Sequence, residues 1–143
     1  MDSNKNIKIF LERGILIEED KKRLLDMYIQ YCYRALSLRS NYECYLVKSR
    51  EKHGIETTAV CLYFEGKVKI YCKDRLFSDV LRSIAHEFCH LKQYENGVKP
   101  PTNYLHFSSQ MEDEANEMAG KLLNAFSEVI GHESVYVKGF EAV

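Results

Sequence analysis

The pentapeptide His86-Glu87-Phe88-Cys89-His90 constrains the fold of this chain more than any other segment. It lies within an amphipathic stretch from about 76 to 95, which Asn96-Gly97 and the prolines beyond it end. A helix places residues four apart on one face, about one turn from each other, so His86 and His90 stand side by side. The helix must therefore leave both imidazoles a polar environment while it buries its apolar side, which consists of Leu81, Ile84, Ala85, Phe88 and Leu91.

Two more segments have helical periodicity. In the segment from about 18 to 38, the positions predicted to face the core are Leu24, Tyr28, Tyr31, Ala35 and Leu38. In the segment from about 109 to 129, the corresponding positions are Met111, Ala115, Met118, Leu122 and Phe126. The sequence therefore predicts one helix before the pentapeptide helix and one after it, with a loop at about 97 to 107 between the last two.

Three runs between the first two helices have the composition of β-strands, at 42–47, 57–64 and 67–73. Glu65-Gly66 separates the second run from the third, which is typical of an antiparallel hairpin. In the third run Val68, Ile70 and Cys72 alternate with Lys67, Lys69, Tyr71 and Lys73, so one face is apolar and the other polar. We expect the lysines to form a solvated face, and a binding strip is the alternative.

The predicted order of elements is α-β-β-β-α-α, an α+β fold with a small sheet that contains an antiparallel pair. The tail from 131 to 143 is ambiguous, and Val135-Tyr136-Val137 has the composition of a short strand. The 143 residues contain no linker-like stretch and no internal repeat, so we expect a single domain over 1–143.

Charge and cysteine content limit the classes of function. The 20 Lys and Arg residues nearly balance the 21 Asp and Glu residues, which argues against a general nucleic-acid binder or a binder of anionic membranes. No apolar run is long enough to span a membrane, and the polar start lacks the apolar segment of a secretory signal. The five cysteines are odd in number and form no CxxC pair. We therefore expect a cytoplasmic protein with reduced, buried cysteines.

The residues of the pentapeptide have the chemistry of a zinc site. Two neighbouring imidazoles can occupy two corners of a zinc tetrahedron, and Glu87, one step round the helix, can reach a metal-bound water without ligating the metal. A catalytic zinc ion also needs a third protein ligand and an open position for water. The candidates for the third ligand are His106 in the loop and Glu112, Glu114 and Glu117 in the last helix.

The periodicity of the last helix excludes one candidate for the third ligand but does not decide between the other two acidic residues. Glu117 has Lys121 four residues on and is assigned to a surface pair. Glu112 and Glu114 flank the apolar stripe on opposite sides, and Glu112 shares its side with Asn116, whose amide suits a residue that supports a ligand. The competing interpretation of Glu112 is structural, because Ser109-Gln110-Met111-Glu112 has the pattern of a capping box.

The pentapeptide and the later run Glu112-Asp113-Glu114-Ala115-Asn116 together resemble the short gluzincin metallopeptidases, and most closely the ImmA/IrrE family. The resemblance covers roughly 68 to 123, a little over a third of the chain. It implies that His86, His90 and Glu112 bind one zinc ion per chain, that Glu87 is the catalytic base and that Asn116 supports a ligand. It also implies a minimal gluzincin-like domain, with one helix, a three-stranded sheet and two helices that carry the site.

We therefore expect a zinc metallopeptidase that acts on a protein or peptide by Glu-assisted attack of a zinc-bound water. Tyr104 and His106 are candidate donors to the oxyanion, and the substrate would lie along the 67–73 strand if that strand is a sheet edge. Cys89 is expected to be a small buried filler rather than a regulatory thiolate. Two alternatives remain: a zinc-containing regulatory or docking protein without peptidase activity, and a SprT-like protease that acts on DNA-bound proteins.

Overall fold

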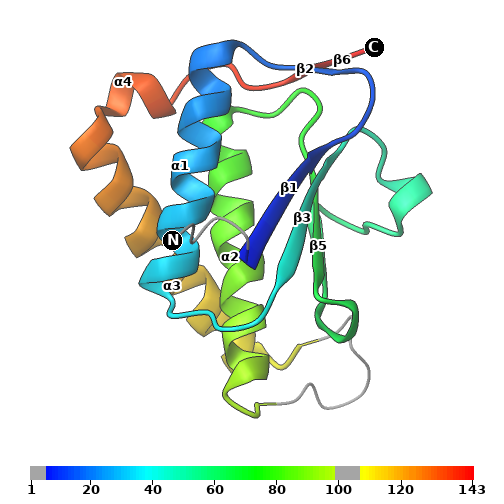
Figure 1. Cartoon of the computed structure of the whole chain (residues 1–143), viewed down its shortest axis with the longest axis vertical. Coiled ribbons are helices and arrows are strands. Elements are labelled where there is room, and N and C mark those ends of the chain that lie inside the picture. Colours follow the sequence, from blue (N-terminus) through cyan, green and yellow to red (C-terminus); the bar gives the residue numbers. More distant parts are fainter. Residues whose placement is uncertain (1–5, 99–106) are drawn as a thin grey trace.

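The computed structural model describes residues 6–98 and 107–143 (Figure 1). Its helices are α1 (Glu19–Ala35), α2 (Phe77–Glu95), α3 (Ser109–Ile130) and the single turn α4 (His132–Val135). Its strands are β1 (Ile7–Leu11), β2 (Ile15–Leu16), β3 (Tyr42–Val47), β4 (Ala59–Leu62), β5 (Lys67–Tyr71) and β6 (Glu141–Ala142), with the short 3-10 helices η2 (Glu51–His53) and η3 (Tyr63–Glu65). The α+β class is confirmed, and the predicted order is present as α1, β3, β4, β5, α2 and α3. The elements β1, β2, α4 and β6 are additional to that order.

Four strands form one mixed sheet in the order β1-β3-β5-β4. β1 and β5 both run parallel to β3, and β4 runs antiparallel to β5. The predicted hairpin is confirmed, because η3 and the left-handed Gly66 reverse the chain between β4 and β5. A parallel pair needs a long crossover connection, and α1 supplies it between β1 and β3. Because β5 pairs with β3 on one side and with β4 on the other, β5 lies inside the sheet, and β4 forms an edge of the sheet in the part of the chain that the structure describes.

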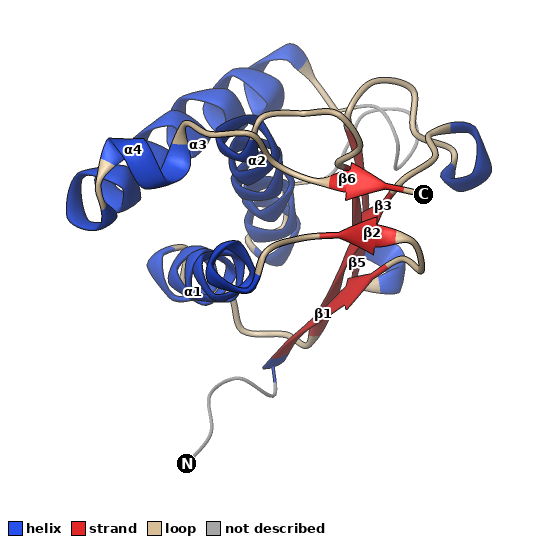
Figure 2. Ribbon diagram, turned by 90° about the horizontal axis from the view of Figure 1, so that it is seen from above, coloured by secondary structure: helices blue, strands red, loops and turns tan. Residues whose placement is uncertain are grey.

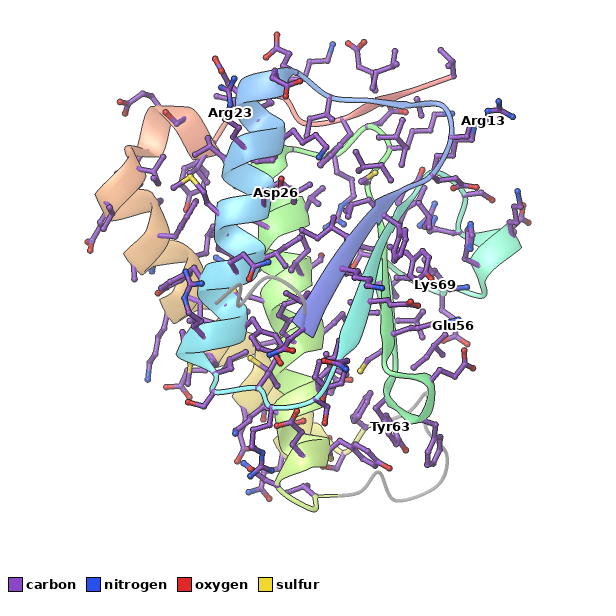
Figure 3. All side chains as sticks on the ribbon, in the orientation of Figure 1. Arg13, Arg23, Asp26, Glu56, Tyr63 and Lys69 are labelled. Carbon is purple, nitrogen blue, oxygen red and sulfur yellow. The ribbon has the colours of Figure 1, made fainter. Side chains whose placement is uncertain are left out.

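The alternation predicted for the third strand is present in β5. Val68 and Ile70 are fully buried, and Lys67 and Lys69 on the other face are partly exposed. Figure 3 shows Lys69 on the side of the sheet away from the helices, so the lysines form a solvated face. The expectation that a substrate lies along this strand is wrong, because β3 and β4 occupy both of its edges.

The long helices cover one face of the sheet (Figures 1 and 2). α2 packs on β4 and β5 and also contacts α1 and α3. Its buried side includes all of the predicted apolar positions, which are Leu81, Ile84, Ala85, Phe88 and Leu91. The pentapeptide therefore lies on the central helix of the fold, between the sheet and α3.

The core faces of the two outer helices differ from the predicted ones. The buried residues of α1 are Leu25, Tyr28, Ile29, Cys32 and Tyr33. Of the predicted positions, Tyr28 is buried, Ala35 is exposed, and Leu38 is buried beyond the end of the helix. Apolar residues occupy two neighbouring faces of this segment, and the position of α2 and the sheet selects one of them. In α3 Met118 is exposed, and Ala119 takes its place in the core.

The prediction of a short strand at Val135-Tyr136-Val137 is wrong. Val135 ends α4, and the strand of the tail is β6, which pairs antiparallel with β2. The Phe77 N–H donates to the carbonyl of Val137 at 2.9 Å, and Phe140 is buried. The tail therefore lies against the N-terminus of α2.

All five cysteines are buried and free, as predicted. Burial raises the pKa of the Cys44 and Cys61 thiols, so both remain protonated at neutral pH. In the described ranges, 6–98 and 107–143, no helix has the length and apolar character that a membrane span requires.

Glu95, at the end of α2, holds the connection between α1 and β3 in place. Its carboxylate accepts hydrogen bonds from the backbone N–H groups of Arg39 (3.0 Å) and Ser40 (3.1 Å) and from the hydroxyl of Tyr42. Burial raises the pKa of this carboxyl, but the bonds from Tyr42, Arg39 and Ser40 outweigh burial, so the pKa lies below its ordinary value. The carboxylate form is therefore the one that the fold stabilises.

Replacement of Glu95 by Gln should lower the free energy of unfolding by about 1–3 kcal/mol at neutral pH, because three donors lose a charged acceptor. A depressed folded-state pKa means that this contribution is present above the unfolded-state pKa and is lost as the pH falls through the folded-state pKa. Urea unfolding at neutral and at acidic pH should therefore give a difference between Glu95→Gln and the parent protein that shrinks in acid. The control Tyr45→Phe, which removes a hydroxyl bonded to Glu43 on the solvated face, should change little. Equal stability of Glu95→Gln and the parent protein at neutral pH would contradict this prediction.

Candidate metal centre

Three side chains from two helices converge on one point. His86 Nε2 lies 2.9 Å and His90 Nε2 lies 3.1 Å from Glu112 Oε1, and the two Nε2 atoms are 3.2 Å apart. His86 and His90 come from successive turns of α2, and Glu112 comes from the first turn of α3. Among the described residues, these three offer donor atoms close enough together to bind one metal ion.

The start of α3 directs Glu112 towards the imidazoles. The N-cap is Ser108, whose Oγ accepts a hydrogen bond from the Met111 N–H at 3.2 Å. The capping-box interpretation, which puts the cap at Ser109 and its partner at Glu112, is therefore wrong by one residue. The Glu112 carboxylate contacts the two imidazoles instead, with 41% of its side chain exposed.

The other two acidic candidates of α3 lie apart from this point. Glu114 is exposed, and its Oε1 accepts a hydrogen bond from Gln93 Nε2 at 3.3 Å. Glu117 pairs with Lys121 at 3.5 Å, as predicted for a surface pair. Asn116 lines the same groove as the imidazoles but makes no hydrogen bond to Glu112 in the described part of the chain. Tyr104 and His106 lie outside the described residues.

Gln93 determines which ring nitrogen of His90 carries the proton. Its Nε2 donates to the carbonyl of Met111 at 3.0 Å and to Glu114 Oε1, so its Oε1 is the atom that lies 2.8 Å from His90 Nδ1. An amide oxygen only accepts, so Nδ1 carries the proton, and Nε2 of a neutral His90 carries the lone pair. Burial lowers the pKa of His90, which favours this neutral form. The sequence analysis missed Gln93, although its position three residues after His90 on the same helix is a signal that could have found it.

The arrangement of donor atoms suits a cation. His90 Nε2 and Glu112 Oε1 both act as acceptors, and they face each other at 3.1 Å. A cation bound to both atoms would remove this repulsion. Nitrogen and oxygen ligands about 2.0–2.2 Å from a tetrahedral zinc ion lie about 3.3–3.6 Å from one another. The separations of 2.9–3.2 Å in this group are close to those values, so the His-His-Glu group fits zinc.

Glu87 lies beside this group and is 8% exposed. Burial raises the pKa of its carboxyl to about 8, and the negative charge of Glu112 contributes to the rise. No hydrogen bond among the described residues uses the Glu87 carboxylate, so its oxygens are available to a molecule in the groove. A carboxyl group with a pKa near neutrality can accept and release a proton at physiological pH.

A groove of about 540 Å³ opens over the three donors and Glu87. One wall is the free edge of β4 with the segment 56–58 that precedes it, and the other wall is the polar side of α2, from Asp79 to His90. Phe107 stacks on the imidazole of His90 with the ring centroids 3.7 Å apart. The sequence analysis did not single out Phe107, because nothing in its local pattern distinguishes it from a packing aromatic.

Cys89 takes no part in the site. Its side chain is buried, with 4% exposed, and burial raises the pKa of its thiol to about 12. A protonated, buried thiol is neither a nucleophile nor a metal ligand. The prediction that Cys89 is a small buried filler is confirmed.

Comparison with known proteins places the fold. No protein-family model matches the chain, and no curated protein matches it. The crystal structure of a Wss1 mutant from Saccharomyces cerevisiae is similar, with a TM-score of 0.56 and 12% sequence identity over 94% of this chain and 100% of that chain. At this identity the similarity shows the fold alone: the chain has an α+β fold with a mixed four-stranded sheet, similar to that structure. The His-His-Glu group of this chain fits zinc.

Proposed function

We propose that this chain is a zinc metallopeptidase. The observation that carries the proposal is the convergence of His86, His90 and Glu112 in an open groove, with the buried carboxyl of Glu87 beside them. Structural zinc sites have four protein ligands and are closed, whereas catalytic sites combine three protein ligands with an open position. Three donors that face a groove agree with the catalytic kind.

A bound zinc ion polarises a peptide carbonyl and lowers the pKa of water. In the proposed reaction Glu87 accepts a proton from the attacking water at a carboxylate oxygen and delivers it to the nitrogen of the leaving amine as the C–N bond breaks. Gln93 keeps His90 in the tautomer whose Nε2 can ligate. The charge of a bound metal ion would oppose the rise in the pKa of Glu87 that burial and Glu112 cause, and would so favour the carboxylate needed as a base.

The substrate is proposed to lie extended along β4. Within 6–98 and 107–143 this strand has a partner on one side only, and its other edge faces the groove without backbone hydrogen bonds. An extended peptide can add to such an edge by main-chain hydrogen bonds. The peptide would then cross the polar side of α2 near His86 and Glu87.

Two subfamily assignments are considered for this chain. The similarity to Wss1 favours the SprT-like protease, the alternative of the sequence analysis, over the ImmA/IrrE family. The carboxylate of Glu112 in the position of the third donor supports the gluzincin ligand set, in which a third His is absent. We therefore propose a Wss1-like zincin with the ligand set His86, His90 and Glu112.

Metal analysis should find about one zinc ion per chain, and Glu112→Gln should remove most of it after dialysis against a weak chelator. An amide is a much weaker zinc ligand than a carboxylate. Glu114→Gln is the matched control, two residues away on the same helix turn, and should keep its zinc. Equal loss of zinc from both variants, or no zinc in the parent protein after growth in zinc-supplemented medium, would contradict the proposed ligand set.

Gln93→Leu should weaken zinc binding by about 10- to 100-fold, although Gln93 lies outside the ligand set. The substitution removes the acceptor of His90 Nδ1–H and two bonds between α2 and α3, so the ligating tautomer is no longer selected. Competition with a chromogenic chelator measures the affinity. Gln110→Leu, an exposed Gln in the first turn of α3, serves as the control and should bind zinc as the parent protein does. Unchanged affinity in Gln93→Leu would show that the bond to His90 does not matter for the metal.

Peptide hydrolysis should fall on the acid side of neutrality, and Glu87→Gln should lower it at least about a hundredfold with zinc still bound. Only the ionised carboxylate accepts a proton, so hydrolysis is lost as the pH falls through the pKa of Glu87 in the zinc-loaded protein. Acid also protonates the imidazoles and releases the metal, so zinc content is measured at each pH. Peptide cleavage assays from acidic to alkaline pH, with and without chelator, test this.

The Glu87→Gln variant also distinguishes the peptidase from a docking protein. A docking protein would keep its function in Glu87→Gln, whereas a peptidase would lose it. Assays with and without single- and double-stranded DNA test the SprT-like alternative, which requires cleavage to respond to DNA. Cleavage of a verified substrate by Glu87→Gln at the parent rate would refute the role of Glu87 as the base.

A further inference from the structure

The groove continues past His86 towards the N-terminus of α2, where two arginines line it. Arg82 stands four residues before His86, so it lies one turn along the same face of the helix. Arg75 lies just before α2, and its guanidinium reaches Ser83 Oγ at 2.9 Å. Neither residue belongs to the machinery proposed for hydrolysis.

Arg75 is a half-buried cation that forms no ion pair among the described residues, although the charge of Asp79 acts to raise its pKa. Its Nη atoms donate to the carbonyls of Tyr71 (2.7 Å) and Asp79 (3.1 Å) and to Ser83 Oγ, which are all neutral acceptors. These bonds use three of the five N–H donors of the guanidinium and fix its orientation. Burial lowers the pKa of Arg75, which records the cost of removing this charge from water. An anion next to the guanidinium would offset that cost.

The guanidinium of Arg82 packs close to α3 at Gly120. A Cβ atom on Gly120 would lie 3.3 Å from Arg82 Nη1, so the absence of a side chain at Gly120 leaves room for the guanidinium beside the helix. A glycine inside a helix costs about 1 kcal/mol relative to alanine, and here it accompanies a close approach. Arg82 is exposed and lines the groove, and within the described ranges it forms no ion pair and no hydrogen bond.

Two acidic residues, Asp79 and Glu56, also line this part of the groove, and both are exposed. Figure 3 shows Glu56 on the side away from the helices. Among the described residues neither carboxylate forms an ion pair with Arg75 or Arg82. Arg82 is exposed like the two carboxylates, so the half-buried Arg75 is the charge that water compensates least.

We propose that Arg75 and Arg82 form a subsite for a carboxylate of the substrate, one helical turn from the metal centre. This rests on the proposed peptidase function and specifies its substrate class as peptides with an acidic group near the cleaved bond. One turn of α2 is about 5.4 Å long and one residue of an extended peptide about 3.3 Å, so the carboxylate belongs to a residue one to three positions from that bond. The carboxylate is supplied either by an Asp or Glu side chain or by the C-terminus of the peptide.

Binding to the zinc-loaded Glu87→Gln variant tests the subsite without cleavage. The probes are N-terminally fluorescein-labelled, amidated ten-residue peptides of Ala and Gly, in which a single Glu or a single Gln is moved through the internal positions. At one position Glu should bind about tenfold more tightly than Gln, as measured by fluorescence anisotropy, because charged hydrogen bonds are the stronger ones. A second set, shortened stepwise and with a free C-terminal carboxylate, distinguishes a terminal carboxylate from a side chain.

Adding Arg82→Gln should reduce the preference for Glu to less than about twofold, with the zinc content unchanged. Arg23→Gln is the control, since this exposed arginine of α1 is paired with Asp20 and lies away from the groove (Figure 3). The subsite is refuted if Glu and Gln peptides bind alike at every position of both sets, if no peptide binds, or if the preference survives Arg82→Gln. The parent protein is tested for cleavage of the same peptides. If Glu peptides bind preferentially but the parent protein cleaves none of them, the subsite is supported and the peptidase function is not. Failure of the subsite can therefore be distinguished from failure of the proposed function.

Discussion

Helix α2 packs against the sheet on one side and against α3 on the other, and the arrangement of the site depends on this double contact. Burial of a large apolar side chain stabilises a fold by about 1.5–3 kcal/mol, and α2 buries several of them, including Leu81, Ile84 and Phe88. This burial fixes the rotation of the helix about its axis. The rotation in turn leaves His86 and His90 facing the first turn of α3, where the carboxylate of Glu112 meets both of them.

The metal centre is organised partly by bonds that do not involve a metal. Gln93 joins α2 to α3 through the carbonyl of Met111 and the carboxylate of Glu114, and the same amide orients His90. The three donors are thereby held together although two of them repel as acceptors. A metal ion binds the folded state far better than the unfolded one, so the free energy that relieves this repulsion also adds to the stability of the fold.

The parts of this structure that could be predicted from the sequence are the ones that local patterns determine. The pentapeptide helix, its i and i+4 imidazoles and the hairpin of β4 and β5 all follow from spacing within about twenty residues. β1 and the pairing of β2 with β6 could not be found in this way, because their partners are distant: Ile7 lies opposite Tyr42, and Ile15 opposite Ala142. The choice between a ligand and a cap for Glu112 depended on a shift of one residue in the start of α3, which helical periodicity cannot resolve. The position of β4 at the edge followed from the parallel pairing of β5 with β3, again a contact between distant segments.

The short edge strand also bears on how a substrate is selected. β4 has four residues, and alternate residues of a strand point their backbone groups to the same edge, so only about two residues offer bonds to an added peptide. Such a short edge protects the protein from unwanted strand pairing, but it gives a substrate little main-chain affinity. Recognition must then come from the side chains along the rest of the groove. The polar side of α2 supplies these side chains from the same helix that carries the metal ligands, so the spacing between recognition and cleavage is set by helix geometry rather than by a loop.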